Sequence, residues 1–464
     1  MYKEFIKFPK DFKFGVSTAS FQIEGGALED GKGKSIWDEF SSHKNNIADG
    51  CNGEITCDHF HKWDIDLDIM KSLGIKNYRF SIAWTRIFPT GKIESYNEKG
   101  MLFYENLIKE MLKRGITPYV TLFHWDLPLE LQKKGGFDNK QTIEDFLSYS
   151  KTVIDRLSPL VKNWMTFNEP WVFSFCGHLF GNHAPGLKDL KTALAVTHNI
   201  LLAHAKTVEY VKNNYSDLEI GIVNNLEQIV SASDKEEDIQ AAKRWNLAFN
   251  SWYLDPLFKG EYPKELVQYY TNHLDENNNI ENVMIEYSDE EMKFIQKNCG
   301  DFLGINYYTR RIIAFDSGNY HLQAKHIFRP TIKRSNFESW EVNPEAFYDL
   351  LIDVKKQYGD IKIYISESGT CGDDFIGEDG CVHDEYRIEY LRRHFAAVQQ
   401  AIVDGVNIKG YFVWSLLDNF EWGFGFTKRF GIVFTDYEDN QNRIIKDSGH
   451  FLSHVIRKNG FIID

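Results

Sequence analysis

The sequence has few cysteines, no basic run and no long apolar run, and each shortage excludes a class of protein. Its 464 residues contain 6 widely spaced cysteines, which we expect to be free thiols and not a disulfide framework. The formal charge of -14 and the lack of a lysine- or arginine-rich patch exclude a nucleic-acid-binding protein. The opening segment, "MYKEFIKFPKDFKFG", lacks the apolar core of a secretory signal or a membrane anchor. We therefore expect a soluble, cytoplasmic protein with no membrane partner.

One cluster of potential metal ligands, Cys51, Cys57, His59 and His61, occurs in "CNGEITCDHFHKW". Structural zinc sites place paired cysteines two to four residues apart, whereas here five residues separate them. Because this spacing disfavours zinc, we predict no metal site. The alternative that we favour is a loop in which His59 and His61 are packed or hydrogen-bonded.

Strand-like and helix-like segments alternate along the chain, and no linker rich in proline, glycine or serine divides it. We therefore expect one domain over residues 1–464. Eight apolar stretches have the length and composition of buried strands. They are "FKFGVSTAS" from Phe12, "IKNYRFSIAW" from Ile75, "ITPYVTLFHW" from Ile116, "VKNWMTFNEP" from Val161, "LEIGIVNN" from Leu218, "DFLGINYYTR" from Asp301, "IKIYISESG" from Ile361 and "IKGYFVWSLLD" from Ile408.

Between these stretches, apolar residues recur at the spacing of amphipathic helices. The predicted helices cover residues 98–114, 142–160, 190–213, 238–254, 344–358 and 384–404. Eight strands alternating with helices predict an α/β fold, a closed (β/α)₈ TIM barrel with long loops after its strands. A doubly wound open sheet is the alternative. It would show a glycine-rich phosphate turn after its first strand, and "GVSTASFQIEGG" is not one.

A barrel of this type carries its chemistry at the carboxyl ends of its strands, on one face. Nearly every predicted strand ends in a side chain that can hydrogen-bond or stack. These side chains are Gln22, Arg79, His124, Asn168, Glu169, Asn225, Asn306, Tyr308, Glu367 and Trp414. Each of these residues alone could have an ordinary structural role, but together they predict a polar pocket lined by aromatic rings. The aromatic content of 15% suits a site that stacks on flat ligand faces such as sugars.

Two of these residues are carboxylates: Glu169 ends the fourth strand in "TFNEP", and Glu367 ends the seventh in "ISESG". Strands four and seven of a small barrel face each other across part of it, so both carboxylates can point into one pocket. Such a pair is the apparatus of glycoside hydrolysis, in which one carboxyl protonates the leaving oxygen and the other meets the anomeric carbon. Arg79 and Tyr308 are available to keep Glu367 ionised, and Asn168 can bind a sugar hydroxyl. On the residues alone, a helix-start role for Glu169 and a capping or ion-pair role for Glu367 stay open.

Seven motifs resemble family 1 of the glycoside hydrolases, the β-glucosidase family, over essentially the whole chain. They are "FKFGVSTASFQIEGG", "YRFSIAWTRIFPTG", "LFHWDLP", "TFNEPW", "GINYYTR", "SWEVNPEAFYDLL" and "WSLLDNFEWGFGFTKRFGIVFTDY". The resemblance implies a (β/α)₈ barrel and a retaining, double-displacement hydrolase with no metal or cofactor. It implies small-molecule substrates, namely β-glucosides and cello-oligosaccharides that lose a terminal non-reducing β-D-glucosyl residue.

The resemblance also implies roles for individual residues. Glu169 is similar to the family's acid/base and Glu367 to its nucleophile. The residues that resemble the family's sugar-hydroxyl ligands are Gln22, His124, Asn168, Glu421 and Trp422. Trp414 resembles the platform under the sugar ring, and Tyr308 resembles the phenol that positions the nucleophile. Arg79 and Asn306 resemble supporting residues behind the site, and Trp171 and Trp340 resemble contacts to the leaving group.

The sequence departs from the family pattern beside the predicted nucleophile. The family usually reads Thr-Glu-Asn-Gly there, whereas this chain has Ser366, Glu367, Ser368 and Gly369. The first change keeps a hydroxyl. The second removes an amide, so we expect altered local hydrogen bonds or loop order at Ser368 with the carboxylate itself in place.

The branch of this family that acts on 6-phosphorylated glycosides differs around the last strand. Its members are expected to replace the Glu-Trp pair with small residues and to add a lysine and a tyrosine that hold phosphate. Here Glu421 and Trp422 are intact, Lys428 is present, and Phe430 stands where the tyrosine would be. Glu421 would repel a phosphate dianion, so the sequence favours unphosphorylated glucosides.

The presence of both glutamates also helps to choose between other activities found in the family. The family's plant thioglucosidases are expected to have a glutamine in place of the acid/base. A non-enzymatic sugar-binding protein is another alternative, but the family's relatives that bind partners have lost a catalytic glutamate. Both Glu169 and Glu367 are present here, which favours an enzyme that acts on O-glycosides. Galactoside or fucoside preference, transfer to a sugar acceptor in place of water, and the oligomeric state stay open.

Overall fold

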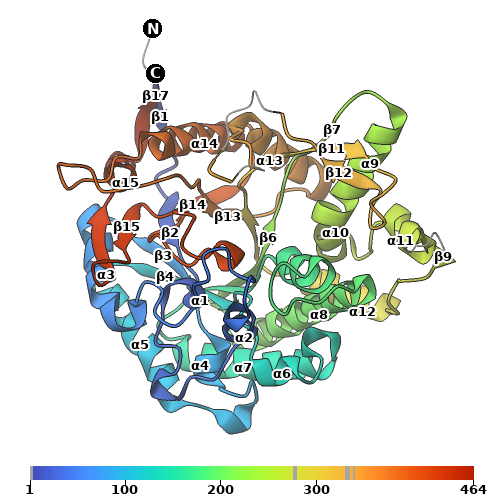
Figure 1. Cartoon of the computed structure of the whole chain (residues 1–464), viewed down its shortest axis with the longest axis horizontal. Coiled ribbons are helices and arrows are strands. Elements are labelled where there is room, and N and C mark those ends of the chain that lie inside the picture. The colour runs from blue at the N-terminus through green and yellow to red at the C-terminus, as the bar shows by residue number, and fades with distance from the viewer. Residues whose placement is uncertain (1–3, 275–279, 330–334, 338–339, 464) are drawn as a thin grey trace.

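The computed structural model describes residues 4–274, 280–329, 335–337 and 340–463. Residues 1–3 of the N-terminal segment and Ser339 of the "SWEV" motif lie outside these ranges. Parallel strands close into a barrel in the order β2, β3, β4, β5, β6, β10, β13 and β14, and β14 pairs with β2 (Figure 1). They are β2 (Lys13–Ser17), β3 (Asn77–Ser81), β4 (Thr117–Phe123), β5 (Asn163–Asn168), β6 (Glu219–Asn225), β10 (Phe302–Asn306), β13 (Ile363–Ser368) and β14 (Ile408–Trp414). All eight predicted strands and the barrel class are confirmed.

Large side chains fill one end of the barrel's interior. A separate buried cluster takes one residue from each of six strands: Tyr119, Met165, Val223, Phe302, Tyr364 and Phe412. Its rings meet edge to face, with centroids 4.8 Å apart for Tyr119 and Phe412. Such packing is favourable for aromatic quadrupoles. Because this plug fills the amino-terminal part of the barrel, the carboxyl ends of the strands are left for a pocket.

A helix or group of helices follows each barrel strand and packs on the outside, as Figure 1 shows. In α5, for example, Met101, Tyr104, Ile108 and Met111 are buried at spacings of three and four residues. The outer helices are α3 (His59–Leu73), α5 (Glu98–Lys113), α7 (Gln141–Leu157), α8 (Leu190–Asn214), α9 (Glu236–Asn246), α10 (Trp252–Lys259), α12 (Asp289–Lys297), α13 (Pro344–Tyr358), α14 (Glu385–Val403) and α15 (Asp447–Lys458). Shorter helices lie in the loops: α1 (Ser20–Ile23), α2 (Ile36–Ser42), α4 (Trp84–Ile87), α6 (Leu129–Gln132) and α11 (Lys264–Thr271).

The six predicted helical stretches are helical, with one refinement. The stretch predicted over residues 238–254 is not one helix, because a π-helical turn at Leu247–Ser251 separates α9 from α10. The sequence did not predict the outer helices α3, α12 and α15 or the short loop helices α1, α2, α4, α6 and α11. Among the described residues, no helix combines the length and the apolar character needed to cross a bilayer.

The predicted loop around Cys51 to His61 is wrong in its second half, because α3 begins at His59. The expectation that the two histidines are packed or hydrogen-bonded is confirmed. His59 is buried, with its Nδ1 2.7 Å from a carboxylate oxygen of Asp66, and His61 Nδ1 lies 2.6 Å from Asp58. The thiol of Cys57 donates to the carbonyl of Asp418 at 3.0 Å. Each of these side chains therefore has a protein partner.

The connections after the strands carry the remaining small sheets. Strands β7 (Ile229–Ser231), β11 (Arg311–Phe315) and β12 (Ala324–His326) form one beside β6 and β10, and β15 (Val433–Asp436) pairs with β16 (Asn442–Ile445). The chain ends meet as antiparallel strands β1 (Glu4–Lys7) and β17 (Gly460–Ile463), and β8 (His273–Leu274) pairs with β9 (Ile280–Glu281). Residues 18–58, 169–189, 307–329, 335–337, 340–343 and 415–446 connect the strands at the carboxyl end of the barrel.

Candidate active site

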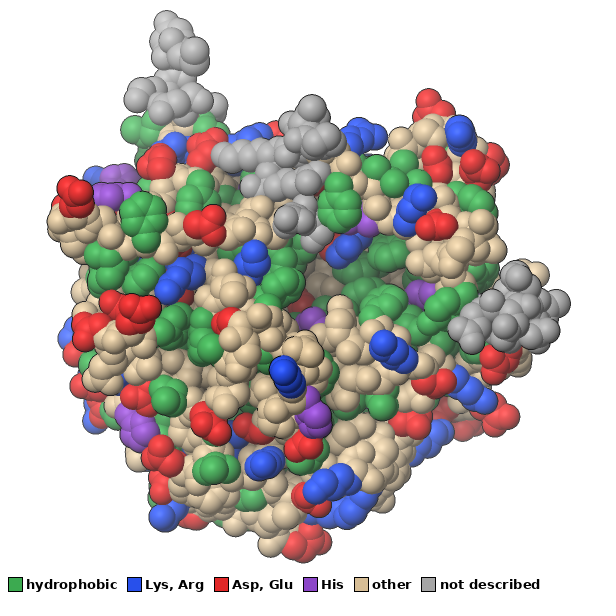
Figure 2. All heavy atoms as spheres, in the orientation of Figure 1, with side chains coloured by type: hydrophobic (Ala, Val, Ile, Leu, Met, Phe, Trp, Pro, Cys, Tyr) green, Lys and Arg blue, Asp and Glu red, His purple; other side chains and the backbone are tan. Residues whose placement is uncertain are grey.

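A hollow of about 190 Å³ opens at the carboxyl ends of the barrel strands. Figure 2 shows its opening near the middle of the displayed face, with hydrophobic side chains around it. Most of the predicted site residues line it: His124, Glu169, Trp171, Asn306, Tyr308, Trp340, Glu367, Trp414, Glu421 and Trp422. Three others, Gln22, Arg79 and Asn168, are buried directly behind the lining. The residues proposed from distant parts of the sequence thus come together in one place.

Glu169 follows β5 and is buried at the carboxyl end of the barrel. Its backbone is left-handed, with φ of 44°, a conformation that is strained for a glutamate and often found at functional sites. One of its carboxylate oxygens, Oε1, accepts a 2.7 Å hydrogen bond from the amide of Asn306. Burial and the nearby charge of Glu367 raise the pKa of Glu169 well above its ordinary value. A raised pKa favours the protonated form, which a proton donor requires.

Glu367 lies near the end of β13 and has a charged partner. The guanidinium of Arg79 donates to its Oε1, and the hydroxyl of Tyr308 donates to its Oε2 at 2.7 Å. Burial raises the pKa of Glu367, whereas Arg79 and Tyr308 act against that rise by stabilising the anion. The two carboxylates therefore differ as an acid and a nucleophile must differ.

A chain of hydrogen bonds links the two carboxylates behind the hollow. The side-chain oxygen of Asn168 accepts from Arg79 at 2.7 Å and from Asn306 at 3.1 Å. Asn306 donates onward to Glu169, and Arg79 donates onward to Glu367. Because each amide and guanidinium group is held on both sides, the two carboxylates are fixed relative to each other before any ligand binds.

A model of the family described as "Glycosyl hydrolase family 1" matches residues 5–461 of this sequence. The chain belongs to glycosyl hydrolase family 1. It is 44% identical over 458 residues to beta-glucosidase A of Thermotoga maritima, covering 98% of each chain. It is 45% identical to the 1,4-beta-D-glucan glucohydrolase of Thermotoga neapolitana, covering 98% of this chain and 99% of the other. The resemblance predicted from the motifs is confirmed, and the protein is a glycoside hydrolase.

Solved structures agree with this assignment. A family 1 β-glucosidase from Thermotoga maritima superposes with a TM-score of 0.93 at 42% identity, covering 99% of both chains. The same enzyme in complex with castanospermine superposes with a TM-score of 0.92 over 98% of this chain and 99% of the other. The barrel fold expected from the sequence is the fold of these family 1 enzymes.

One side of the family 1 hollow offers unpartnered polar atoms. The Nδ1 atom of His124 and the Oε1 atom of Gln22 are buried without a protein partner. Gln22 also donates to Asn419 at 3.1 Å, to the carbonyl of Phe420 at 2.9 Å and to Glu421 at 3.4 Å. Buried polar atoms cost free energy unless a ligand or water satisfies them, so these atoms suit the hydroxyl groups of a ligand.

The surroundings of Glu421 and His124 favour the uncharged form of each side chain. Burial and the charge of Glu367 raise the pKa of Glu421 to about 8. Burial and the positive charge of Arg79 hold the pKa of His124 well below its ordinary value. A neutral imidazole and a largely protonated carboxyl can both donate and accept, which suits sugar hydroxyls. The rings of Trp414 and Trp422 are each nearly parallel to the ring of His124, at centroid distances of 6.0 and 5.8 Å.

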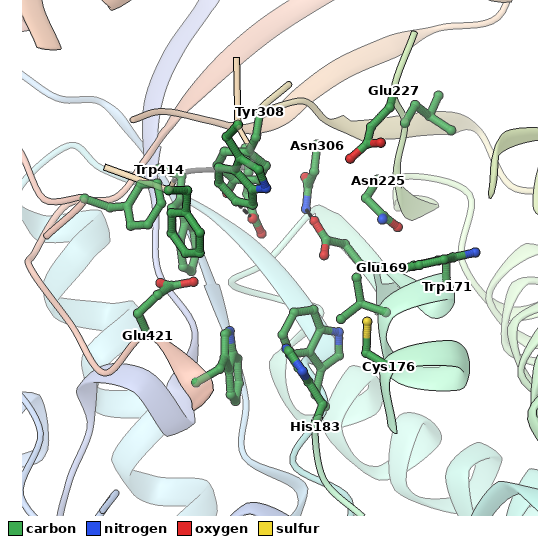
Figure 3. Close-up of a pocket in the computed structure, with 18 of the residues that line it drawn as sticks. Glu169, Trp171, Cys176, His183, Asn225, Glu227, Asn306, Tyr308, Trp414 and Glu421 are labelled. Carbon is green, nitrogen blue, oxygen red and sulfur yellow. Dashed lines mark hydrogen bonds between the residues drawn. The ribbon is translucent and has the colours of Figure 1, made fainter. Parts of the chain in front are cut away.

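The two aromatic residues predicted for the leaving-group side both line the hollow. Trp171 packs on Phe249 with centroids 4.5 Å apart, and Trp340 stacks on Tyr308 at 4.8 Å. In Figure 3, Trp171 lies on one side of Glu169, and Trp414 and Glu421 lie on the other. The hollow therefore has two sides, with Glu169 between them.

Sequence reasoning missed several residues that line the hollow. Asn225 was recognised as a strand end but left out of the predicted site, and Trp125 directly follows His124. The others come from loops, from the π-helix Val172–Phe180 or from the small sheet: Val172, Cys176, His183, Leu226, Glu227, Phe249, Arg311, Phe337, Phe424 and Phe430. For Asn225 and Trp125 the strand-end rule was a sufficient signal. The loop residues carry none, because periodicity does not encode the path of a loop.

The departure at Ser368 has a local structural explanation. The Ser368 hydroxyl is buried and lies 3.0 Å from the hydroxyl of Tyr390 on α14. Tyr390 in turn stacks on His394 with ring centroids 3.7 Å apart. Ser368 thus points from β13 to the outer helix and not into the hollow, so its side chain takes part in strand–helix packing.

Proposed function

We propose that this enzyme is a retaining β-glucosidase that removes terminal non-reducing β-D-glucosyl residues from β-glucosides and cello-oligosaccharides. The observation that carries the proposal is the contrast between its two buried carboxyls. Glu169 has an amide partner and a raised pKa, whereas Glu367 has Arg79 and Tyr308 to stabilise its charge. The relatives named beta-glucosidase and 1,4-beta-D-glucan glucohydrolase support the choice of sugar.

The proposed first step is glycosylation. Glu367, kept ionised by Arg79 and Tyr308, attacks the anomeric carbon and forms a glycosyl ester. Glu169 gives its proton to the leaving glycosidic oxygen, so the aglycone departs as a neutral alcohol. Burial and the charge of Glu367 both raise the pKa of Glu169, and the second of these influences is removed when the charge of Glu367 is consumed in the ester.

The proposed second step is hydrolysis of that ester. Glu169 is ionised after giving its proton to the leaving oxygen, and it is no longer repelled by a charge on Glu367. It can therefore act as the base that deprotonates a water molecule. Water attacks the anomeric carbon, the ester bond to Glu367 breaks, and the β-configuration is restored. The same coupling between the two carboxyls thus serves both steps.

Three observations favour glucose without a phosphate group. Glu421 lies on the sugar side of the hollow, where its carboxyl would repel a phosphate dianion once ionised. Lys428 is occupied elsewhere, because its ammonium group donates to the carbonyl of Asn336 at 2.8 Å. Phe430 contributes a ring and no hydroxyl.

A panel of 4-nitrophenyl β-glycosides (gluco, galacto, fuco, xylo and 6-phospho-gluco), together with cellobiose, tests the proposal. We expect the glucoside and cellobiose to be cleaved and the 6-phospho-glucoside to have a kcat/KM at least about tenfold lower than the glucoside. A 6-phospho-glucoside preferred over the glucoside, or no cleavage of any β-glycoside, would overturn it.

Some expectations from the sequence stay predictions. They are the organisation of residues 1–464 as one domain, the cytoplasmic location, the lack of a cofactor and a role in cellulose degradation. The sites assigned to individual residues belong to the present proposal, and the choice between hydrolysis and sugar transfer awaits kinetic data. The oligomeric state stays open.

A further inference from the structure

Ser366, the residue before Glu367, turns its hydroxyl toward the neighbouring strand β10. It is fully buried, and its Oγ donates to Asn306 Oδ1 at 2.7 Å. Along β10, Ile305 pairs with Ile365 of β13. The next residue, Asn306, pairs with Glu367, so Ser366 is an extra residue in β13. Because such a bulge redirects side chains, the consecutive residues Ser366 and Glu367 both direct polar atoms toward the site.

The backbone of Ser366 is held independently of its hydroxyl. Its carbonyl accepts from Ser17 Oγ at 2.7 Å and from Arg79 Nη1 at 3.2 Å. Gly304 on β10 leaves the room that the hydroxyl occupies, since a Cβ at that position would lie 2.9 Å from Ser366 Oγ. Removal of the hydroxyl alone should therefore leave the backbone and its two partners in place.

The amide of Asn306 has an accepting end and a donating end, and its orientation decides which of them Glu169 meets. With its oxygen bound to Ser366, its nitrogen donates to Asn168 Oδ1 at 3.1 Å and to Glu169 Oε1 at 2.7 Å. Figure 3 shows this amide directed toward Glu169. Asn168 Oδ1 also accepts from Arg79, which can only donate, so a reversed Asn306 amide would set two acceptors against each other. Ser366 and Asn168 thus select the same orientation from opposite ends.

This orientation matters because Glu169 must hold a proton in the first step and lack it in the second. Burial and the charge of Glu367 raise the pKa of Glu169, and the hydrogen bond from Asn306 acts against that rise by stabilising the anion. Other charged or titratable groups reach Glu169 from β13, β3, the loops after β10 and β14, and the π-helix. They are Glu367, Arg79, Tyr308, Glu421 and Cys176. A change at Ser366 leaves all of them in place.

We propose that Ser366 is a positioning residue of the acid/base, whose hydroxyl holds the Asn306 amide with its N–H group facing Glu169. This inference rests on the proposed function and deepens it. Ser366 acts through Asn306 and does not line the hollow, so its effect is on the protonation of Glu169 and not on sugar binding. The strand that carries the nucleophile thereby also adjusts the acid/base.

The test uses the pH profiles of two substrates that report different steps. The alkaline limb of kcat/KM for cellobiose reports the acid of the free enzyme. The acid limb of kcat for 2,4-dinitrophenyl β-glucoside reports the base of the second step, because its leaving group departs without a proton. The variants are Ser366→Ala, which removes the hydroxyl, and Ser366→Thr, which keeps it. Ser368→Ala is the control, since it removes a buried hydroxyl from the same strand that faces Tyr390 at 3.0 Å.

We expect both limbs to move to higher pH in Ser366→Ala, by about 0.5 to 1 pH unit, as for one weakened hydrogen bond. The sign follows because loss of a donor to the anion raises the pKa of Glu169 further. On the acid side, kcat for the dinitrophenyl glucoside should fall about three- to tenfold. Ser366→Thr and Ser368→Ala should keep the wild-type limbs. Thermal melting of each variant checks that it is folded.

A double-mutant cycle tests whether Ser366 acts through the amide. In an Asn306→Ala background, Ser366→Ala should move neither limb further, since the hydroxyl has lost its acceptor. If Ser366→Ala does not fold, Ser366→Cys, which has a similar size and a weak donor, must move the limbs in the same direction. Unmoved limbs, an equal shift in Ser366→Thr, or an equal shift with and without Asn306 overturns the inference. A wild-type enzyme that cleaves neither substrate overturns the proposed function instead.

Discussion

Replacement of Tyr308 by phenylalanine tests how the nucleophile is kept ionised. The Tyr308 hydroxyl donates to Glu367 Oε2 at 2.7 Å, and its ring stacks on Trp340, so the substitution removes one charge-assisted hydrogen bond and keeps the stack. A hydrogen bond to a charged group contributes about 1.5–3 kcal/mol. If that bond stabilises the anion that attacks, kcat/KM should fall about 10- to 150-fold.

The pH profile gives the sign of this effect. Tyr308 favours the ionised form of Glu367, so its loss raises the pKa of that carboxyl and reduces the ionised fraction on the acid side. The acid limb of kcat/KM for 4-nitrophenyl β-glucoside should therefore move to higher pH, because this limb reports the essential base of the free enzyme.

A neighbouring tyrosine provides the control for Tyr308→Phe. Tyr307 is buried, its hydroxyl donates to the carbonyl of Asn343 at 2.8 Å, and its ring stacks on Phe347 at 4.1 Å. Tyr307→Phe removes an equivalent hydrogen bond outside the hollow, so it should leave the acid limb in place. The reasoning is refuted if Tyr308→Phe leaves the limb unmoved or moves it to lower pH.

Three further changes have distinct expected outcomes. Glu169→Gln should lower kcat for cellobiose about 10²–10⁴-fold, with a much smaller loss in the first step for 2,4-dinitrophenyl β-glucoside, whose leaving group needs no proton; equal losses would contradict its role as the acid. Ser368→Ala removes the bond to Tyr390 and should lower the free energy of unfolding by about 1 kcal/mol in urea titrations, with kcat/KM changed less than about twofold. Folding raises the pKa of Glu421 from 4.5 to about 8, so the unfolded chain releases this proton at lower pH than the folded chain does. The contribution of Glu421 to the free energy of unfolding therefore falls as the pH rises from about 4.5 to about 8. The melting temperature of Glu421→Gln relative to the wild type should therefore rise from pH 4.5 to pH 8 and level off above it; a falling difference would contradict the assignment.

The barrel was predictable because its strands are apolar on both faces and end abruptly in polar residues. In β13, Ile363 and Ile365 are buried beside Glu367, and the change from apolar to ionisable residues marks the end of the strand. The helix α3 was not predictable by the same rule. Trp63, Ile65, Leu67 and Ile69 alternate with polar residues there, which is the period of a strand.

Tertiary contacts decide the structure of α3. Its buried residues are His59, Asp66, Leu67, Met70 and Leu73, which share one helical face. Asp66 can be buried because His59 and Arg443 bind its carboxylate, and Arg443 is 377 positions away in the chain. A local sequence pattern cannot show such a distant partner, so the periodicity alone indicates a strand where the structure has a helix.

The candidate site was predictable to the extent that its residues belong to barrel strands. Glu169, Asn306, Glu367 and Trp414 were found because the carboxyl ends of parallel strands meet on one face. The leaving-group side was mostly missed, since residues such as Arg311 come from the loops and from the small sheet. Their positions depend on how long connections fold over the barrel, and the sequence pattern carries no signal of that path.

The central claim is that Glu367 forms a covalent glycosyl ester. Treatment with 2,4-dinitrophenyl 2-deoxy-2-fluoro-β-glucoside, which slows the breakdown of such an ester, should inactivate the enzyme with one label per chain. After digestion, mass spectrometry should locate the label on Glu367 within the peptide that contains "IKIYISESGT". A label on Glu169 or elsewhere, or inactivation without a covalent label, would contradict the claim.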